Sequence, residues 1–309
     1  MQAHAVVLDQ PKALSMRRLP LTDLGPGDVV VDMLWSGISS GTERLLWSGE
    51  MPPFPGLAYP LVPGYESVGE IVSAPDGSGL DIGQRVFVPG ADCYGEVRGL
   101  FGGTASRVVI PAEKAVPVPR DLGAEAVLLA LAATAHHALE TAAALPELII
   151  GHGVLGRLLA RLTLLKGGAP VVWETNPTRR SAPYPVISPE DDPRRDYRAI
   201  CDVSGDAGIL DSLIHRLVKG GEILLAGFYA ERLSFAFPMA FIREAKLSIA
   251  AEWSAADMAA VTRLAAEGTL ALDGLLTHTA RPEDAAGAYR TAFEDADCLK
   301  MTLDWRNAA

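Results

Sequence analysis

The sequence has little of three features that mark common protein classes: cysteine, excess positive charge and long apolar runs. Only three cysteines occur in 309 residues, Cys93, Cys201 and Cys298, and they are far apart. Their spacing provides neither a disulfide framework nor a thiolate zinc cluster, and it suits a reducing compartment. We therefore expect a cytoplasmic protein.

Charge and hydropathy exclude further classes. The net charge of −11 argues against nucleic acid as a partner, because a duplex binder needs a basic face. The longest apolar run, residues 126–135, is too short to span a bilayer, and the N-terminus lacks the pattern of a signal peptide. Hydrophobic residues make up 49% of the chain, enough for the cores of two ordinary domains, and no transmembrane segment is expected.

The pattern of short elements changes along the chain. Residues 1–120 hold short β-like runs separated by Gly and Pro, which predict a partly closed antiparallel barrel. Residues 121–269 open with a long helix and then alternate strands with helices, including a helix over 209–220, which predicts a doubly wound parallel sheet. Residues 270–309 end in a strand that should return to the first domain. The predicted fold class is α/β, with a β-rich domain and a Rossmann domain.

A glycine-rich loop stands between a predicted strand and a predicted helix. Its glycines, Gly151, Gly153 and Gly156, let the backbone turn tightly and approach a pyrophosphate at the helix N-terminus. The alternative is that they only shape a strand–helix turn. The strand before the loop and the helix after it favour dinucleotide binding.

The next strand ends at Glu174, whose carboxylate could accept hydrogen bonds from both ribose hydroxyls of NAD. Arg179 and Arg180 follow and would instead suit the phosphate of NADP; we favour NAD. His152 could touch phosphate, but we expect it to point to solvent. The predicted cofactor-binding residues are Gly151, His152, Gly153, Val154, Leu155, Gly156, Glu174, Arg179, Ser204 and Gly227.

A β-rich domain, a Rossmann domain and a final strand that returns to the first domain together resemble the medium-chain dehydrogenase/reductase superfamily. The resemblance implies a GroES-like catalytic domain over 1–120, completed by 270–309. In its zinc alcohol dehydrogenases, a Gly-x-Cys element and a Gly-His-Glu element supply zinc ligands; here Ser39 and Tyr65 stand at those positions. Serine hydroxyl and neutral tyrosine are poor zinc ligands. We therefore expect an enzyme that works without a metal.

A long block from "SGISSGTERLLW" through "PGYESVGEIV" to "GLFGG" resembles the bacteriochlorophyll-pathway dehydrogenases that oxidise a hydroxyethyl group on the macrocycle. This resemblance implies a bacteriochlorophyllide, a magnesium tetrapyrrole, as substrate, and an NAD-dependent alcohol dehydrogenase of class EC 1.1.1. A flat apolar substrate suits aromatic walls and a cationic anchor. The candidates are Arg44, Trp47, Phe54, Tyr59, Tyr94 and Phe101, which could equally form the domain's own core and surface.

Without zinc, a side chain must take the proton of the alcohol. Tyr65 is the first candidate, but its ordinary pKa of about 10 requires a depressed value or a relay. Ser39 and Thr42 could form that relay, and Glu66 could hold Tyr65 or act as the base itself. His136 and His137 could supply a base or a magnesium ligand; alternatively, one is packed and the other exposed.

Two other functions fit the same residues. An NADPH-dependent quinone or enone reductase shares the fold and needs no metal, but should prefer a pocket for the 2′-phosphate. A non-catalytic nucleotide-binding protein would bind NAD without turnover. By analogy with superfamily relatives, a homodimer could form through the edge strand of the Rossmann sheet, within residues 246–253.

Overall fold

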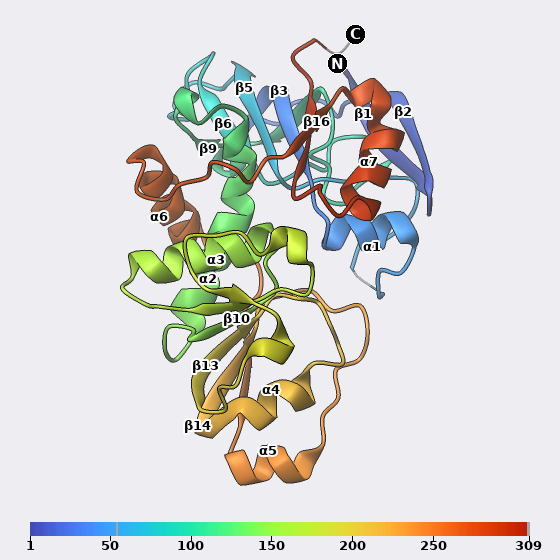
Figure 1. The fold of residues 1–309 in the computed structure, drawn as a ribbon. Coiled ribbons are helices and arrows are strands. Elements are labelled where there is room, and N and C mark those ends of the chain that lie inside the picture. The colour runs from blue at the N-terminus through green and yellow to red at the C-terminus, as the bar shows by residue number, and fades with distance from the viewer. Residues whose placement is uncertain (54, 308–309) are drawn as a thin grey trace. The chain divides into compact units, whose positions relative to one another are not determined.

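The computed structural model describes residues 1–53 and 55–307, so Phe54 lies outside the described residues. The chain divides into two units (Figure 1). The first comprises Met1–Ala130 together with the chain from Leu272 onward, and the second is Leu131–Ala271.

The first unit contains two sheets. The four-stranded sheet has the order β2 (Ala13–Pro20), β1 (Gln2–Gln10), β4 (Leu61–Val62), β7 (Arg98–Gly99). The seven-stranded sheet has the order β16 (His278–Ala280), β17 (Met301–Asp304), β3 (Asp28–Ile38), β5 (Ser67–Ser73), β6 (Arg85–Val88), β9 (Val116–Pro117), and β8 (Arg107–Pro111) also pairs with β3. The first unit is rich in short strands, as predicted, although β4–β7 and β16–β17 pair in parallel instead of antiparallel.

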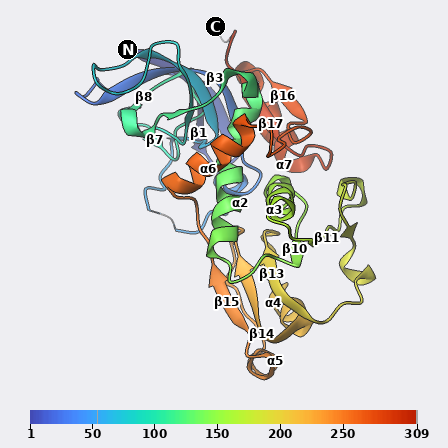
Figure 2. The ribbon, with the colours of Figure 1, turned by 90° about the vertical axis from the view of Figure 1, so that its left-hand side faces the viewer.

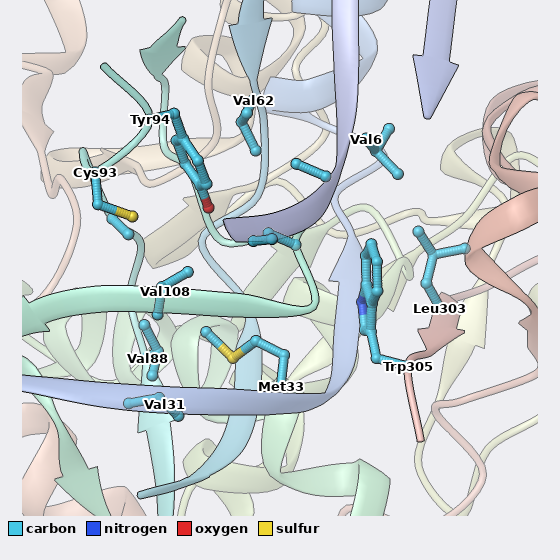
Figure 3. Close-up of a cluster of buried hydrophobic side chains, with 14 of the residues drawn as sticks. Val6, Val31, Met33, Val62, Val88, Cys93, Tyr94, Val108, Leu303 and Trp305 are labelled. Carbon is cyan, nitrogen blue, oxygen red and sulfur yellow. The ribbon is translucent and has the colours of Figure 1, made fainter. Parts of the chain in front are cut away.

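One apolar core serves both sheets of the first unit. Figure 3 shows side chains from β1, β3, β6, β8 and β17 meeting in it, among them Val6, Met33, Val88, Val108 and Leu303. The final strand β17 pairs antiparallel with β3, so the C-terminal segment belongs to this unit. The helices of the unit are α1 (Thr42–Ser48), η1 (Ala112–Lys114), η2 (Arg120–Leu128), η5 (Pro282–Asp284) and α7 (Ala285–Glu294).

The second unit is built on a six-stranded sheet whose strands all run parallel, as the Rossmann prediction requires. Its order is β12 (Val186–Ile187), β11 (Val171–Trp173), β10 (Leu148–Ile150), β13 (Tyr197–Asp202), β14 (Leu217–Leu225), β15 (Lys246–Ile249). The accompanying helices are α2 (Leu129–Thr141), α3 (Val154–Leu165), η3 (Pro177–Arg179), η4 (Pro189–Asp191), α4 (Leu210–Arg216), α5 (Phe237–Arg243) and α6 (Ala255–Ala266). Helix α3 packs on β10, while α4 and α5 pack on β14.

The helix expected over 209–220 is shorter than predicted. It ends at Arg216, and Leu217 already belongs to β14, where it pairs with Tyr197 of β13. Burial of Leu217 beside that strand overrides the helical pattern of the local sequence.

One helical stretch, Arg120–Thr141, is long and apolar enough to cross a membrane by length and composition alone. It is longer than the apolar run recognised in the sequence. More than half of its most apolar window is buried inside the protein, as in the core helix of a globular domain. In the part of the chain that the structure describes, the three cysteines are buried and none forms a disulfide.

Candidate active site

Two hydroxyl groups meet where strands β3 and β5 lie side by side. Ser39 directly follows β3 and Tyr65 stands two residues before β5, and the two strands pair antiparallel with Ser36 opposite Ser67. The Ser39 Oγ and Tyr65 Oη atoms share a hydrogen bond of 2.7 Å, and Thr42 also hydrogen-bonds Tyr65. The sheet register thus brings together the three hydroxyl residues predicted for this site.

Gly64 gives Tyr65 its position. It has a φ of +97°, a conformation that favours glycine, and a β-carbon there would collide with the hydroxyl of Thr104. The main chain before Tyr65 therefore packs directly against the Gly103–Thr104 segment, which donates hydrogen bonds to the carbonyls of Gly64 and Pro63.

The pKa of Tyr65 is raised, not depressed as one of the two alternatives from the sequence required. Burial of the hydroxyl raises this pKa, the negative charge of Glu66 raises it further, and the hydrogen bond with Ser39 opposes the shift. The neutral phenol is therefore the favoured form. Any role in accepting a proton requires Tyr65 to pass on its own proton through a relay.

Glu66 pairs with a lysine and not with the hydroxyl groups of this relay. Its carboxylate is fully buried and forms an ion pair with Lys300, which precedes β17. Gly37 of β3 makes room for the pair, because a side chain there would collide with the Glu66 carboxylate. Glu66 influences Tyr65 through its charge, whereas the side-chain partners of the Tyr65 hydroxyl are Ser39 and Thr42.

A second buried carboxylate, Glu43 in the first turn of α1, was missed in the sequence. Its Oε1 atom accepts the backbone N–H of Ser39 at 3.0 Å, and its Oε2 atom accepts the hydroxyl of Tyr289 at 2.7 Å. Burial raises its pKa to about 7, against the two hydrogen bonds, which lower it. A Glu four residues after Ser39 at a helix start was the available signal, but nothing in the sequence indicated its burial.

Zinc does not fit the residues that replace the family's ligands. Ser39 offers a neutral hydroxyl already bonded to Tyr65, and the raised pKa of Tyr65 disfavours the phenolate that would bind a cation. Across residues 1–53 and 55–307, no cluster of three or more His, Cys, Asp or Glu side chains is arranged to hold a metal ion.

His136 and His137 lie on α2 in the second unit, and both bond the same carboxylate. The Nδ1 atoms of His136 and His137 lie 2.7 and 2.9 Å from the two oxygens of Asp257 on α6. Their side chains are 14% and 31% exposed, so the expectation of one packed and one exposed histidine is wrong. Figure 2 shows α2 and α6 side by side, and this cluster joins them.

Asp257 also closes a capping box with Ser254 at the start of α6. Burial would raise its pKa, but hydrogen bonds from Ser254 and from both histidines hold the pKa below its usual range. Because a carboxylate only accepts, each Nδ1 carries a proton, and the Nε2 atoms are the nitrogens able to accept one.

The dinucleotide loop has the geometry that its three glycines predict. Gly151 follows β10 with a φ of +95°, and Gly153 caps α3 with open space around the position of a β-carbon. At Gly156 a β-carbon would collide with the carbonyl oxygen of Gly151, so helix and loop pack closely there. Tight turn, close approach and close packing are the three roles expected for a nicotinamide dinucleotide loop. Val154 and Leu155 form the first turn of α3.

Glu174 stands at the carboxyl end of β11 and turns back toward this loop. Its two carboxylate oxygens accept the backbone N–H groups of His152 at 3.1 Å and of Asn176 at 2.8 Å. Arg180 is engaged locally, since its guanidinium donates to the carbonyls of Glu174 and Thr175. The negative charge of Glu174 is therefore fixed beside the glycine loop.

His152 is fully buried, so the expectation that it points to solvent is wrong. Its Nδ1 lies 2.5 Å from the carbonyl oxygen of Arg179, and its Nε2 lies 2.9 Å from the hydroxyl of Tyr184. Burial lowers its pKa, so the neutral form dominates; Nδ1 then donates to the carbonyl and Nε2 accepts from the tyrosine. His152 joins the glycine loop to the segment after β11.

Ser204 and Gly227 follow the ends of β13 and β14, and Asp202 organises both turns. Its side chain accepts the N–H of Ser204 at 2.8 Å, and its carbonyl accepts the N–H of Gly227 at 3.2 Å. Tyr229 donates a hydrogen bond to the buried Asp202 carboxylate at 2.9 Å. Neither Asp202 nor Tyr229 was singled out from the sequence.

The candidate substrate residues divide by exposure. Tyr94 is only 1% exposed and its hydroxyl donates to the carbonyl of Gly102, so it belongs to the core (Figure 3) and its prediction as a substrate wall is wrong. Phe101 is partly exposed and meets Tyr65 edge to face, with ring centroids 5.4 Å apart. It therefore stands beside the candidate proton acceptor.

Of the other three described candidates, Arg44 and Trp47 are on α1 and Tyr59 hydrogen-bonds to that helix. Trp47 is partly buried and packs against Phe293 of α7, with centroids 5.4 Å apart. Tyr59 is also partly buried and donates to the carbonyl of Leu46 at 2.5 Å. Arg44 is exposed on α1.

Comparison with known proteins agrees with this architecture. Residues 25–120 match the alcohol dehydrogenase GroES-like domain family. 2R,3R-butanediol dehydrogenase from Bacillus subtilis superposes with a TM-score of 0.83 at 19% identity, covering 98% of this chain and 99% of that one. L-idonate 5-dehydrogenase from Escherichia coli gives 0.86 at 17% identity, with 98% of each chain covered. This is the fold of the medium-chain dehydrogenases, and two solved structures that share it hold NADH and NADP.

The sequence comparison narrows that class. The chain is 56% identical to 2-desacetyl-2-hydroxyethyl bacteriochlorophyllide A dehydrogenase of Rhodobacter capsulatus and 54% identical to that of Cereibacter sphaeroides, with 100% of each chain covered. The chain belongs to this family of dehydrogenases.

Proposed function

We propose that this protein oxidises the hydroxyethyl side chain of a bacteriochlorophyllide to an acetyl group, with NAD accepting the hydride. The observation that carries the proposal is the full-length identity of 56% to a dehydrogenase named for that substrate. The reaction is an alcohol oxidation of class EC 1.1.1, which suits a cytoplasmic enzyme with a soluble cofactor. The glycine loop Gly151–Gly156 and the turns at Ser204 and Gly227 would hold the dinucleotide.

The choice of NAD over NADP rests on Glu174. Two backbone N–H groups fix its carboxylate at the strand end where the adenosine ribose of a Rossmann cofactor lies. A fixed negative charge there would repel a 2′-phosphate and accept hydrogen bonds from the ribose hydroxyls. The hydrogen bonds of Arg180 to backbone carbonyls keep that guanidinium engaged in the turn.

Proton transfer in this proposal runs through hydroxyl groups. A bound NAD would supply the acceptor for the hydride of the carbinol carbon. Tyr65 accepts the alcohol proton while its own proton passes to one of its two hydroxyl partners, Ser39 or the partly exposed Thr42, and from there to water. Phe101, edge-on to Tyr65, would contact the macrocycle, with Tyr59 and Trp47 as further walls and Arg44 as an anchor for its carboxylate.

We also propose that the reaction needs no zinc, because the hydroxyl pair Ser39–Tyr65 replaces a thiolate and an imidazole. The expected result is full activity after dialysis against a strong chelator, with less than a tenth of an equivalent of zinc by elemental analysis, as an order-of-magnitude limit. Activity that falls on chelation and returns with zinc would contradict this.

A homodimer through β15 is the proposed assembly. Strand β15 lies at the edge of its sheet (Figure 2). Both β15 and α5 carry exposed apolar side chains. Phe237, Phe241, Ile242 and Ile249 are 67%, 68%, 63% and 73% exposed. Pairing of two such edges would cover them. Ile249→Lys should convert a dimer to a monomer in sedimentation; a wild-type monomer overturns the assignment.

The decisive experiment mixes purified protein with hydroxyethyl bacteriochlorophyllide and either NAD or NADP, and follows the long-wavelength absorption of the macrocycle. We expect the shift produced by a conjugated acetyl group with NAD and little with NADP. Glu174→Ala should lower kcat/KM for NAD by about tenfold, whereas substitution of the exposed Glu231 by Gln should not. No shift with either cofactor, together with quinone-dependent oxidation of NADPH, would favour the reductase alternative.

A further inference from the structure

Glu43 is a buried carboxylate without a cation of its own. It is 0% exposed, and its two oxygens are occupied by the N–H of Ser39 and the hydroxyl of Tyr289. The nearby ammonium group of Lys300 is paired with Glu66 instead. In the described part of the chain, no Lys, Arg or His forms an ion pair with Glu43. A buried carboxylate left in this state is costly and is a common mark of a functional position.

The position of Glu43 relates it directly to the hydroxyl relay. Its Oε1 atom holds the main chain of Ser39, and the Ser39 side chain in turn holds the Tyr65 hydroxyl. The charge of Glu43 reaches Tyr65 as well and raises the pKa of that phenol. One carboxylate therefore fixes the geometry of the relay and supplies negative charge behind it.

We propose that Glu43 is a positioning residue for the alcohol oxidation: its ionised carboxylate fixes Ser39 and electrostatically favours movement of the alcohol proton onto Tyr65. This inference rests on the proposed function. The alcohol O–H bond breaks as its proton moves to the Tyr65 oxygen, and the proton of Tyr65 passes to one of its two hydroxyl partners, Ser39 or Thr42, and from there to water. The carbinol C–H bond breaks as hydride, which would carry both electrons to the nicotinamide of NAD while the C=O bond forms, and Glu43 is unchanged at the end.

The protonation state of Glu43 should govern this effect. Burial raises its pKa to about 7, and the charge of Glu66 acts in the same direction. The hydrogen bonds from Tyr289 and Ser39 and the charge of Lys300 act in the opposite direction and lower the pKa. These groups come from α7, the turn after β3, the segment before β5 and the segment before β17. Below pH 7 the carboxylate becomes neutral and its attraction for the proton is lost. The oxidation rate should therefore rise with pH through this range.

Two variants test the proposal because they change the same titration in different ways. Glu43→Gln keeps the size of the side chain and an acceptor for Ser39, but removes the charge. Tyr289→Phe removes a hydrogen bond that lowers the pKa of Glu43, so it should raise that pKa further. The readout is kcat under saturating substrate and NAD between pH 5.5 and 9, with the KM for NAD as a measure of an intact second unit.

We expect wild-type kcat to rise through a pKa near 7. In Glu43→Gln this rise should disappear and kcat at pH 9 should fall by about tenfold, while in Tyr289→Phe the rise should move to higher pH. Identical profiles in all three proteins would overturn the role of Glu43. An equal loss at every pH would also overturn it, because a purely structural role moves no titration. Absence of turnover in the wild-type protein would overturn the proposed function itself. That result is distinct from the two results above, in which the wild type is active and only the role of Glu43 fails.

Discussion

The Glu43→Gln substitution should also change how folding stability depends on pH, whatever the substrate. Glu43 has an ordinary pKa of 4.5 when unfolded and about 7 when folded, since burial disfavours its charge. The folded state therefore binds this proton more tightly. The stabilisation is complete below pH 4.5 and is lost as the pH rises through 7.

The size of the effect follows from the two pKa values. One pKa unit corresponds to about 1.4 kcal/mol. Through Glu43 alone, the free energy of unfolding of the wild-type protein should therefore fall by about 2.5 kcal/mol between pH 5 and pH 8. Glutamine does not titrate, so the variant lacks this loss. The free energy of unfolding of Glu43→Gln, measured relative to that of the wild type, should therefore rise by about 2.5 kcal/mol across the same interval. Glu66, whose pKa burial also raises, largely cancels because both proteins contain it.

Urea unfolding at pH 5, 6, 7 and 8, followed by far-ultraviolet circular dichroism, measures this difference. Because the chain has two units, the transition that includes the first unit is the relevant one. Tryptophan fluorescence is recorded in parallel, and the first unit contributes Trp35, Trp47 and Trp305 to it, whereas Trp173 and Trp253 report the second. A difference between variant and wild type that stays constant from pH 5 to 8 would refute the assignment of a raised pKa to Glu43.

Three further outcomes are expected. Gly37→Ala should destabilise the first unit by about 2 kcal/mol, because the new methyl group collides with the Glu66 carboxylate; an unchanged urea midpoint would contradict the packing described. Gly153→Ala meets no neighbouring atom and should fold normally, but its methyl group should weaken NAD binding in calorimetry by about tenfold. His152→Ala should raise the KM for NAD several-fold at unchanged kcat, because His152 and Tyr184 join the glycine loop to the segment after β11. Tyr184→Phe should give a KM between those of the wild type and His152→Ala. A fall in kcat alone would argue against that role.

Local pattern was sufficient for the parts of the site that lie on one strand–turn–helix unit. Gly151, Gly153 and Gly156 could be read because their spacing follows from the geometry of a single loop, and Glu174 because it ends the next strand. The prediction for His152 failed in the same loop. Its burial depends on Tyr184 and on the carbonyl of Arg179, which lie 32 and 27 residues away.

The hydroxyl site shows a similar limit. Ser39 and Tyr65 could be singled out because their types differ from the family's metal ligands at known motif positions. Glu43 and Tyr289 could not, since 246 residues separate them and they meet only because the C-terminal segment returns to the first unit. The prediction that Tyr94 contacts the substrate failed because an aromatic residue in a loop gives no local sign that it points into the core.

The sequence by itself determined the two-domain α/β organisation, the glycine loop, the acidic residue after the next strand and the hydroxyl residues Ser39 and Tyr65. These features depend on residue type and short spacing, which the local chain fixes. Only the tertiary structure decided which groups are charged, buried and paired: the raised pKa values of Tyr65 and Glu43, the Glu66–Lys300 ion pair and the shared bond of His136 and His137 to Asp257. Burial and long-range pairing set the free energy of a charge, and both arise only when distant segments pack together.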